Sequence, residues 1–287
     1  MSDQPILALD IGGSSVKSAL VAAGPRVLNR ISVDAIESKA SADQILNTLA
    51  AIIKGYLPNT GGVRGIALAF PGPFDYEQGI CLIRNQDKYD ALYGLDISAN
   101  LKRILGMPNL EMRYRNDAEA AILGEALYGA GIPYTRLIGL TLGTGLGSAF
   151  IAERNLITEG GDVPPHGWLY SCRFESQRAD DVFSTRGLLA RLHERGINAV
   201  DVVSALQVTG QDNASLAESF ASFGLDLGRF LQPFASTFRA EAVLVTGGIT
   251  EAWERFAPLL NHSLSVPVVK GRLGRRAALL GAAALYS

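Results

Sequence analysis

The stretch "ALDIGGSSVKSAL", residues 8–20, contains two short apolar segments on either side of a Gly-Gly pair. Alternating apolar side chains predict two strands, at 5–11 and 16–22, and the glycines permit a tight turn between them. A Rossmann fingerprint requires G-x-G-x-x-G at the start of a helix, and a P-loop requires G-x-x-x-x-G-K-[ST]. Neither pattern is present, so the stretch predicts a β-hairpin and excludes both of these phosphate loops.

The composition is that of a globular protein with more than one lobe. The chain has 287 residues, of which 48% are hydrophobic and 19% are charged, so two lobes of about 100–150 residues each are expected. The net charge is −2, which gives no overall field that favours nucleic acid or an anionic membrane. A basic run at 270–276 is interpreted as a solvated loop and helix start. We expect neither nucleic acid nor membrane as a partner.

The cysteine content and the N-terminal sequence both indicate where in the cell the protein is located. Cys81 and Cys172 are too few for a disulfide framework, and their spacing matches no zinc site. The first residues contain no basic segment followed by an apolar one, and no apolar stretch reaches the length of a membrane span. These features predict a cytoplasmic protein.

The rest of the chain alternates strand and helix patterns, and a second glycine-containing strand pair repeats the first. Turn-rich segments lie at 71–79 and 160–180, and we expect the second to be a substrate loop. A helix starts abruptly in "RNDAEAAILGEALYGAG", residues 115–131. The other predicted strands are 65–70, 110–114, 137–143, 147–152 and 242–248, and the other predicted helices are 41–56, 96–105, 184–195, 199–207, 214–238 and 275–286.

The glycine turns and the polar residues beside them are candidates for anion binding. Glycines in the first turn and at 143–147 let backbone N–H groups approach a phosphate, although each turn alone is also explained as a tight hairpin. Asp10 ends an apolar strand, where a hydrated Mg²⁺ or the turn's own backbone would stabilise its carboxylate. Lys17 in the next strand points at phosphates or at water, and the sequence leaves both open.

Asn116 and Asp117 immediately precede a predicted helix. A carboxylate there could accept the proton of a hydroxyl that attacks a phosphoryl group. Asn116 with Glu119 three residues later also resembles a capping box, so the pair could serve only to start the helix. The two roles are compatible.

Two further segments suggest ligand contacts. "LVTGGIT", residues 244–250, ends a buried strand in Gly247-Gly248, which suits a flat adenine or a ribose. His166 follows two prolines and could hydrogen-bond a sugar hydroxyl, although a loop histidine is commonly a surface residue. No other His or Cys clusters with it, so no structural metal is predicted.

Taken in order, five motifs and a closing segment resemble a ROK-family sugar kinase, a branch of the hexokinase, actin and heat-shock ATPase superfamily. The motifs are "ALDIGGSSVKSAL", "ALAFPGPFDYEQGI", "RNDAEAAILGEALYGAG", "LTLGTGLGSAFI" and "LVTGGI", and the closing segment is "LGRRAALLGAAAL". The resemblance implies an α/β, two-lobed hexokinase/actin-like (ribonuclease H-like) fold, each lobe a mixed sheet flanked by helices. The expected lobes are 1–115, with the helix at 275–287 packed back on it, and 116–274.

The resemblance also implies a role for each matching residue. It implies ATP and Mg²⁺, a hexose as the phosphate acceptor, a homodimer, Asp117 as catalytic base, and Asp10 as a metal ligand through water. Asn116 and Asn85 match sugar ligands of the family. The implied nucleotide-binding residues are Gly12, Gly13, Ser14, Lys17, Gly143, Thr144, Gly145, Gly247 and Gly248.

One segment departs from the family pattern. The family carries Glu-x-Gly-His, then a cysteine-rich zinc motif and a further sugar-binding Glu, whereas this chain has "GGDVPPHGWLYSCRFESQRADDVFS" at 160–184. The zinc cysteines are missing, so no structural zinc is expected. By this resemblance, we expect His166 to take the place of the motif histidine, and Asp180 or Asp181 that of the later Glu. The sugar stays open among glucose, mannose, fructose and an N-acetylated hexosamine.

The leading hypothesis is therefore an ATP-dependent hexose kinase, and the sequence leaves several alternatives. The pattern "DIGGSxxK" is similar to that of the family's polyphosphate-using glucokinases, which makes a polyphosphate-dependent glucokinase or mannokinase the first alternative. A catalytically idle sugar-binding member is the second. A repressor would need a helix-turn-helix domain before the hairpin, which starts by residue 6. An iron–sulfur ATPase of the dehydratase-activator branch would need cluster cysteines, for which Cys81 and Cys172 have no setting.

Overall fold

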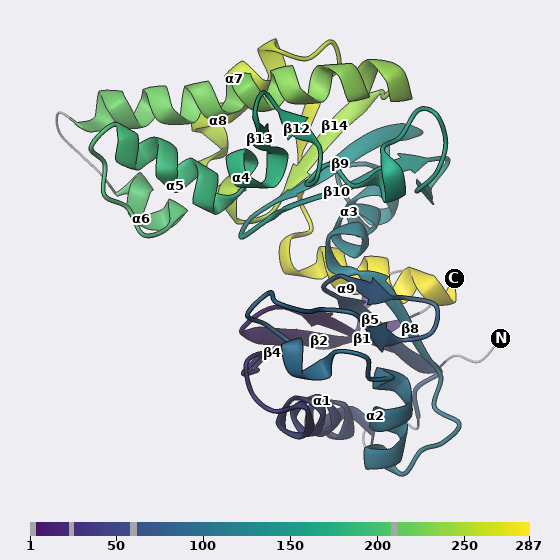
Figure 1. Cartoon of the computed structure of the whole chain (residues 1–287). Coiled ribbons are helices and arrows are strands. Elements are labelled where there is room, and N and C mark those ends of the chain that lie inside the picture. Colours follow the sequence, from purple (N-terminus) through teal and green to yellow (C-terminus); the bar gives the residue numbers. More distant parts are fainter. Residues whose placement is uncertain (1–3, 23–25, 58–61, 208–211) are drawn as a thin grey trace. The chain divides into compact units, whose positions relative to one another are not determined.

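The computed structural model describes residues 4–22, 26–57, 62–207 and 212–287. The chain divides into two compact units, Met1–Gly124 with Arg275–Ser287, and Glu125–Gly274. This division lies inside helix α3 (Asp117–Tyr128), whereas the boundary expected from the sequence, 115/116, lies just before that helix. Each unit is mixed α/β (Figure 1).

The first unit is built on a mixed sheet in the order β3-β2-β1-β5-β8, with β4 also paired to β2. The predicted hairpin is confirmed, because β1 and β2 pair antiparallel with Asp10 opposite Lys17. β1, β5 and β8 pair parallel to one another. The strands are β1 (Ile6–Ile11), β2 (Ser15–Ala22), β3 (Arg26–Val27), β4 (Ser32–Ala35), β5 (Gly65–Phe70) and β8 (Met112–Asn116).

Helices cover both faces of this sheet (Figure 1). α1 (Ala42–Tyr56) and α2 (Ile97–Leu105) pack together, and their first turns are capped by Ser41 and Asp96. α9 (Ala277–Ala283) packs on β1 and β5. The predicted turn-rich segment at 71–79 contains β6 (Phe74–Asp75), which pairs with β7 (Ile80–Cys81).

The second unit repeats the strand order of the first. Its sheet runs β11-β10-β9-β14-β15, with β10 antiparallel to β9 and β11, and with β9, β14 and β15 parallel. The echo that the sequence showed in two glycine-turned hairpins thus extends to a whole five-stranded pattern. The strands are β9 (Arg136–Leu142), β10 (Leu146–Ala152), β11 (Asn155–Ile157), β14 (Ala242–Thr246) and β15 (Val268–Lys270).

The longest helix of the second unit, α7 (Asp212–Phe238), packs along α8 (Trp253–His262). Neither α8 nor β15 was predicted, because Pro258 breaks the helical pattern of α8 and β15 has only three residues. The remaining helices are α4 (Ala179–Phe183), α5 (Thr185–Glu194) and α6 (Val202–Leu206). Of the helices described, none is both long and apolar enough to cross a membrane.

The expected irregular loop at 160–180 is in part regular, so this prediction was wrong in part. β12 (Arg173–Phe174) and β13 (Gln177–Arg178) form a short hairpin, and α4 begins directly after it. The Phe174 ring lies 5.1 Å from that of Phe183 and 6.1 Å from that of Phe230. One aromatic side chain therefore joins the hairpin to the apolar core of the unit, which a local sequence pattern does not reveal.

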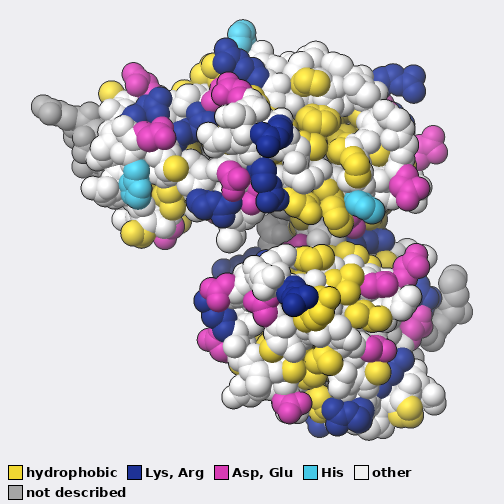
Figure 2. All heavy atoms as spheres, in the orientation of Figure 1, with side chains coloured by type: hydrophobic (Ala, Val, Ile, Leu, Met, Phe, Trp, Pro, Cys, Tyr) yellow, Lys and Arg dark blue, Asp and Glu magenta, His cyan; other side chains and the backbone are white. Residues whose placement is uncertain are grey.

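Surface charge agrees with the small net charge of the chain. Figure 2 shows Lys and Arg interspersed with Asp and Glu over the visible face of each unit. Basic side chains on that face are thus interspersed with acidic and neutral ones.

The close approach of α9 to α3 gives a stability prediction. A Cβ atom added at Gly281 in α9 would lie 1.8 Å from the Ala120 carbonyl oxygen in α3, so the helices must separate to admit it. We expect Gly281→Ala to lower the free energy of unfolding by about 1–3 kcal/mol or more. In α1, Gly55 has no atom within 4 Å of an added Cβ, so Gly55→Ala should raise it by about 0.5–1 kcal/mol. Urea denaturation of the two variants measures both values, and similar effects of the two would contradict this account.

Candidate active site

The carboxyl ends of β1, β5 and β8 lie at one edge of the first unit's sheet, because the three strands are parallel. In register, Asp10 is paired with Ala69, and Ala69 with Arg115. Asn116 and Asp117 directly follow Arg115, where β8 passes into α3. The strand pairing thus brings Asp10, Asn116 and Asp117 to the same edge, which is where ligands bind in open α/β sheets.

Asp10 forms an ion pair with Lys17. Its Oδ2 lies 2.6 Å from Nζ of Lys17, and the two side chains are 13% and 27% exposed. A carboxylate at the end of a buried strand requires a partner of opposite charge or hydrogen-bond donors, and Lys17 is that partner. The sequence left open whether Lys17 points at phosphates or at water; in the structure its ammonium group lies on the Asp10 carboxylate.

The turn between β1 and β2 has open space beside its second glycine. The Gly12 N–H donates to the Ser15 carbonyl over 2.9 Å, and a Cβ added at Gly12 would lie 3.1 Å from that same oxygen. A Cβ added at Gly13 would have nothing within 4 Å. Gly13 and Ser14 are both exposed. The turn therefore has room for an anion next to its backbone.

Asn116 caps α3, as one of its two predicted roles requires. Its Oδ1 accepts from the backbone N–H groups of Ala118 (3.0 Å) and Glu119 (3.2 Å). Its Nδ2 donates to the Tyr76 hydroxyl over 3.0 Å, and Tyr76 donates to the Phe70 carbonyl over 3.1 Å. These bonds fix the amide and use one of its two N–H groups. Tyr76 was not predicted, since it lies in a turn forty residues away along the chain.

The Asp117 carboxyl group has a raised pKa. Burial is the largest cause, and the nearby Asp10 carboxylate adds to it, while the Ala118 N–H and the Lys88 ammonium act in the opposite direction. The Ala118 N–H donates to Asp117 Oδ1 over 2.9 Å. A carboxylate with a raised pKa binds a proton more readily, which is the property that a general base requires.

Asn85 lies in an exposed loop of the same unit. Three residues of this loop, Asn85, Asp87 and Tyr89, have positive φ angles of 58°, 59° and 57°. Among the described residues no hydrogen bond joins Asn85 to Asn116 or Asp117. The charge of Lys88, in the same loop, lowers the pKa of Asp117. The role of Asn85 stays a prediction.

In the second unit, the turn between β9 and β10 is held by two residues of the segment around α4 and α5. The Thr185 N–H and Oγ1 both donate to the Gly143 carbonyl, over 2.7 Å and 2.9 Å. The Leu146 N–H donates to Asp180 Oδ1 over 2.8 Å. Thr144 and Gly145 of this turn are exposed. As in the first unit, the middle of the turn is exposed, while Gly143 and Leu146 at its two ends are held by hydrogen bonds.

Asp180 and Asp181 have partners within the second unit. Arg186 lies 3.2 Å from the Asp180 carboxylate and 2.7 Å from that of Asp181. Asp180 thus belongs to the second glycine turn, through Leu146, as well as to this ion pair. The sequence resemblance predicted both as sugar ligands, and this stays a prediction.

The structure requires a glycine at position 247 but leaves space for a side chain at position 248. Gly247 has φ 99°, and an added Cβ would lie 2.4 Å from the Leu142 carbonyl oxygen at the end of β9. Gly248 would have nothing within 4 Å. The close contact between Gly247 and Leu142 sets the end of β14 against the start of the second glycine turn. Two segments that the sequence predicted to bind nucleotide are therefore neighbours within this unit.

His166 lies in the second unit. It is exposed, has φ 58°, and its ring lies 4.6 Å from that of Trp168. No hydrogen bond from His166 to Asp180 or Asp181 is present in the part of the chain described. Its predicted sugar contact stays a prediction.

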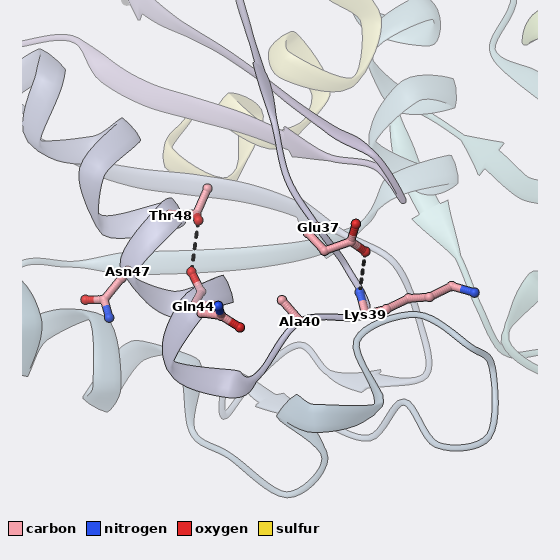
Figure 3. Close-up of a pocket in the computed structure, with 6 residues that line it drawn as sticks. All are labelled: Glu37, Lys39, Ala40, Gln44, Asn47 and Thr48. Atoms are coloured by element: carbon pink, nitrogen blue, oxygen red, sulfur yellow. Dashed lines mark hydrogen bonds between the residues drawn. The ribbon is translucent and has the colours of Figure 1, made fainter.

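A hollow of about 830 Å³ lies beside the start of α1 (Figure 3). It is lined by Glu37, Lys39, Ala40, Gln44, Asn47 and Thr48. None of these is a residue that the sequence predicted for the site. Gln44 already belongs to the cap of α1, and Glu37 accepts from the Lys39 N–H, so this polar surface is explained by local structure.

The carboxylates at the sheet edge fit the requirements of Mg²⁺. Among the described residues no three His, Cys, Asp or Glu side chains lie together as a closed metal site. Mg²⁺ needs no such cage, because it keeps several waters and uses one or two carboxylates. Asp10 and Asp117, which interact through their charges at one sheet edge, have this composition.

The sequence profile of the ROK family matches residues 6–287. This chain belongs to the ROK family. It is 23% identical to a glucokinase of Thermotoga maritima, over 98% of this chain and 96% of that one. It is also 23% identical to an N-acetylmannosamine kinase of Shigella flexneri, over 98% and 97%. A ROK glucokinase of Streptomyces griseus, solved with glucose and AMPPNP, superposes with a TM-score of 0.77 at 21% identity, over 98% of each chain. The fold of this ROK protein is the two-lobed hexokinase/actin-like fold.

The raised pKa of Asp117 gives a prediction about stability. The folded protein holds this proton more tightly than the unfolded chain, so the carboxyl favours folding at low pH, and this contribution is lost as the pH rises through the folded-state pKa. We therefore expect Asp117→Asn to unfold at a higher temperature than the wild type near neutral pH. The difference should shrink as the pH falls toward the ordinary value of 3.8.

Thermal unfolding from acid to neutral pH measures this difference. The matched control is Asp87→Asn in the same unit, because the Asp87 side chain is 81% exposed and its surface ion pair with Lys39 contributes little. A lower unfolding temperature for Asp117→Asn near neutral pH would contradict the prediction.

Proposed function

We propose that this ROK protein is a sugar kinase that transfers the terminal phosphate of ATP to a hydroxyl of a hexose, with Asp117 as the general base. The observation that carries the proposal is the grouping of Asp117, Asn116 and Asp10 at the edge of one sheet that also bears an open glycine turn. The names of the relatives, glucokinase and N-acetylmannosamine kinase, support the choice of a sugar as acceptor.

Asp117 would accept the proton of the attacking sugar hydroxyl. The carboxylate is fixed at the first turn of α3 by the Ala118 N–H, and its raised pKa favours proton uptake. Asn116 would orient the sugar through the amide hydrogen that its bond to Tyr76 leaves over. The predicted sugar contacts of Asn85, His166, Asp180 and Asp181 are part of the same proposal.

The backbone at the two glycine turns would hold the phosphates of the donor. Phosphoryl transfer depends mainly on positioning and on stabilising charge at the transferred group. Backbone N–H groups near Gly13, Ser14, Thr144 and Gly145 would do this, together with the ammonium group of Lys17. Mg²⁺, held through water by Asp10, would neutralise charge on the phosphates. Gly247 and Gly248 would face the nucleoside.

The test is a coupled ADP-release assay with Mg²⁺·ATP against glucose, mannose, fructose, N-acetylglucosamine and N-acetylmannosamine. We expect one of these sugars to stimulate turnover, and Asp117→Asn to lower kcat by about 10²–10⁴ with little change in sugar binding, because only the proton acceptor is lost. Asp43→Asn, an exposed residue in the first turn of α1, is the control and should keep wild-type turnover.

The pH profile adds a second check. Asp117 accepts a proton only when ionised, so kcat/KM should rise with pH through its raised pKa. Undiminished turnover in Asp117→Asn would overturn the proposed role of this residue. Phosphorylation of the sugar from polyphosphate but not from ATP would change the donor and leave the acceptor chemistry in place.

Gly13 gives a prediction about donor binding. Since a Cβ at Gly13 meets no protein atom within 4 Å, Gly13→Ala should leave the unfolding temperature nearly unchanged. The methyl group would, however, occupy the space beside the backbone where a phosphate would bind. We expect KM for ATP to rise at least about tenfold, which corresponds to about 1.4 kcal/mol, while KM for the sugar changes little. Steady-state kinetics with each substrate varied in turn gives both values, and an unchanged KM for ATP would show that this turn does not contact the donor.

A further inference from the structure

We propose that the Tyr89 hydroxyl is a positioning group for the first glycine turn: it holds the Gly12 carbonyl inward and thereby keeps the Gly13 N–H facing outward as a phosphate donor group. This inference rests on the proposed function, in which that turn binds the phosphates of ATP. Tyr89 lies in the loop that also contains Asn85, 77 residues away from the turn in the sequence.

Tyr89 is completely buried and hydrogen-bonded at both ends. Its hydroxyl donates to the Gly12 carbonyl over 2.6 Å, and its backbone N–H donates to the Ser38 carbonyl over 2.6 Å. Its ring lies 5.6 Å from that of Phe70. The Ile36 N–H, two residues before Ser38, donates to the Ser14 carbonyl over 3.1 Å. The turn, the segment 36–38 and Tyr89 are thus joined in one closed set of hydrogen bonds.

Because of the geometry of the peptide bond, the contact between Tyr89 and the Gly12 carbonyl also sets the direction of the Gly13 N–H. The Gly12 carbonyl and the Gly13 N–H belong to one planar trans peptide unit, so they point in opposite directions. When Tyr89 holds the carbonyl toward the protein interior, the N–H is directed to the open side, where an added Cβ at Gly13 meets nothing within 4 Å.

Without such a contact, this peptide unit has little that fixes its direction. Both flanking residues are glycines, which accept φ angles of either sign, so the plane between them rotates at low cost. The rotated peptide would present a carbonyl oxygen in place of the N–H, and that oxygen would repel a phosphate. The Tyr89 hydroxyl opposes this rotation.

The second unit contains the same arrangement at the equivalent position. Gly143 follows β9 as Gly12 follows β1, and its carbonyl is held by two donors of Thr185. The Thr144 N–H, in the same peptide unit, is consequently directed away from Thr185. Two turns with unrelated anchoring residues thus hold the same carbonyl, which supports a function in orienting the next N–H rather than an accident of packing.

The first test compares Tyr89→Phe with Tyr114→Phe. Tyr114 is a buried tyrosine of the same unit whose hydroxyl bonds to Ser98 over 2.8 Å, away from the turn, so each variant loses one buried hydroxyl. We expect kcat/KM for ATP to fall about tenfold in Tyr89→Phe and to stay within about twofold of wild type in Tyr114→Phe, with KM for the sugar unchanged in both. Thr185→Val keeps the backbone bond to Gly143, so its loss should be smaller than that of Tyr89→Phe.

Equal effects of Tyr89→Phe and Tyr114→Phe on kcat/KM for ATP would overturn the proposal, because they would show a general consequence of losing a buried hydroxyl. A second measurement covers the case in which Tyr89→Phe does not fold. In wild-type protein labelled with ¹⁵N-glycine, the Gly13 amide resonance, assigned with Gly13→Ala, should shift on addition of AMPPNP and Mg²⁺. An unmoved resonance at saturating nucleotide would also overturn the proposal.

The two experiments separate this inference from the proposed function. If the wild-type protein phosphorylates no sugar, the proposed function fails, and the ¹⁵N measurement still tests the turn through nucleotide binding alone. If a sugar is phosphorylated and Tyr89→Phe behaves as wild type, the positioning role fails and the kinase stands.

Discussion

The parallel pairing of β1, β5 and β8 is the constraint on which the candidate site depends. It places Asp10, at the end of the first strand, in register with the end of a strand formed about a hundred residues later, where Asn116 and Asp117 begin α3. No local motif brings these carboxylates together. A shift of register by one residue in either pair would turn the polar ends toward opposite faces of the sheet, so the chemistry of the site depends on the register of these buried strands.

Other side chains hold the groups that would touch substrate in place through hydrogen bonds. Tyr76 fixes the amide of Asn116, Tyr89 fixes the Gly12 carbonyl, and Thr185 fixes the Gly143 carbonyl. Each of these contacts joins segments distant in sequence. The glycines supply freedom for close approach, and the anchoring side chains remove that freedom from the peptide units where direction matters.

The sequence predicted the fold well where patterns were local. The hairpin at 5–22 follows from alternation and glycine position, the strand at 65–70 from a continuous apolar run, and the start of α3 from a capping asparagine. It failed for α8, which contains Pro258, and for the short hairpin that Phe174 joins to the core. Within motifs, the sequence predicted Asp10 and Asp117 as candidate residues, and the strand register brings them to the same edge of the sheet. The sequence did not predict Tyr89, since a tyrosine in a polar loop carries no sign that its hydroxyl reaches a turn 77 residues earlier.

The return of the chain to its first unit has a consequence for biosynthesis. The cover of β1 and β5 is α9, at residues 277–283, whereas the second unit is complete at Gly274. During synthesis, β1 and β5 are therefore translated long before α9, the helix that packs on them. The whole of the second unit, Glu125–Gly274, is translated before α9 as well. The order in which the two units become complete is thus the reverse of the order in which their synthesis begins.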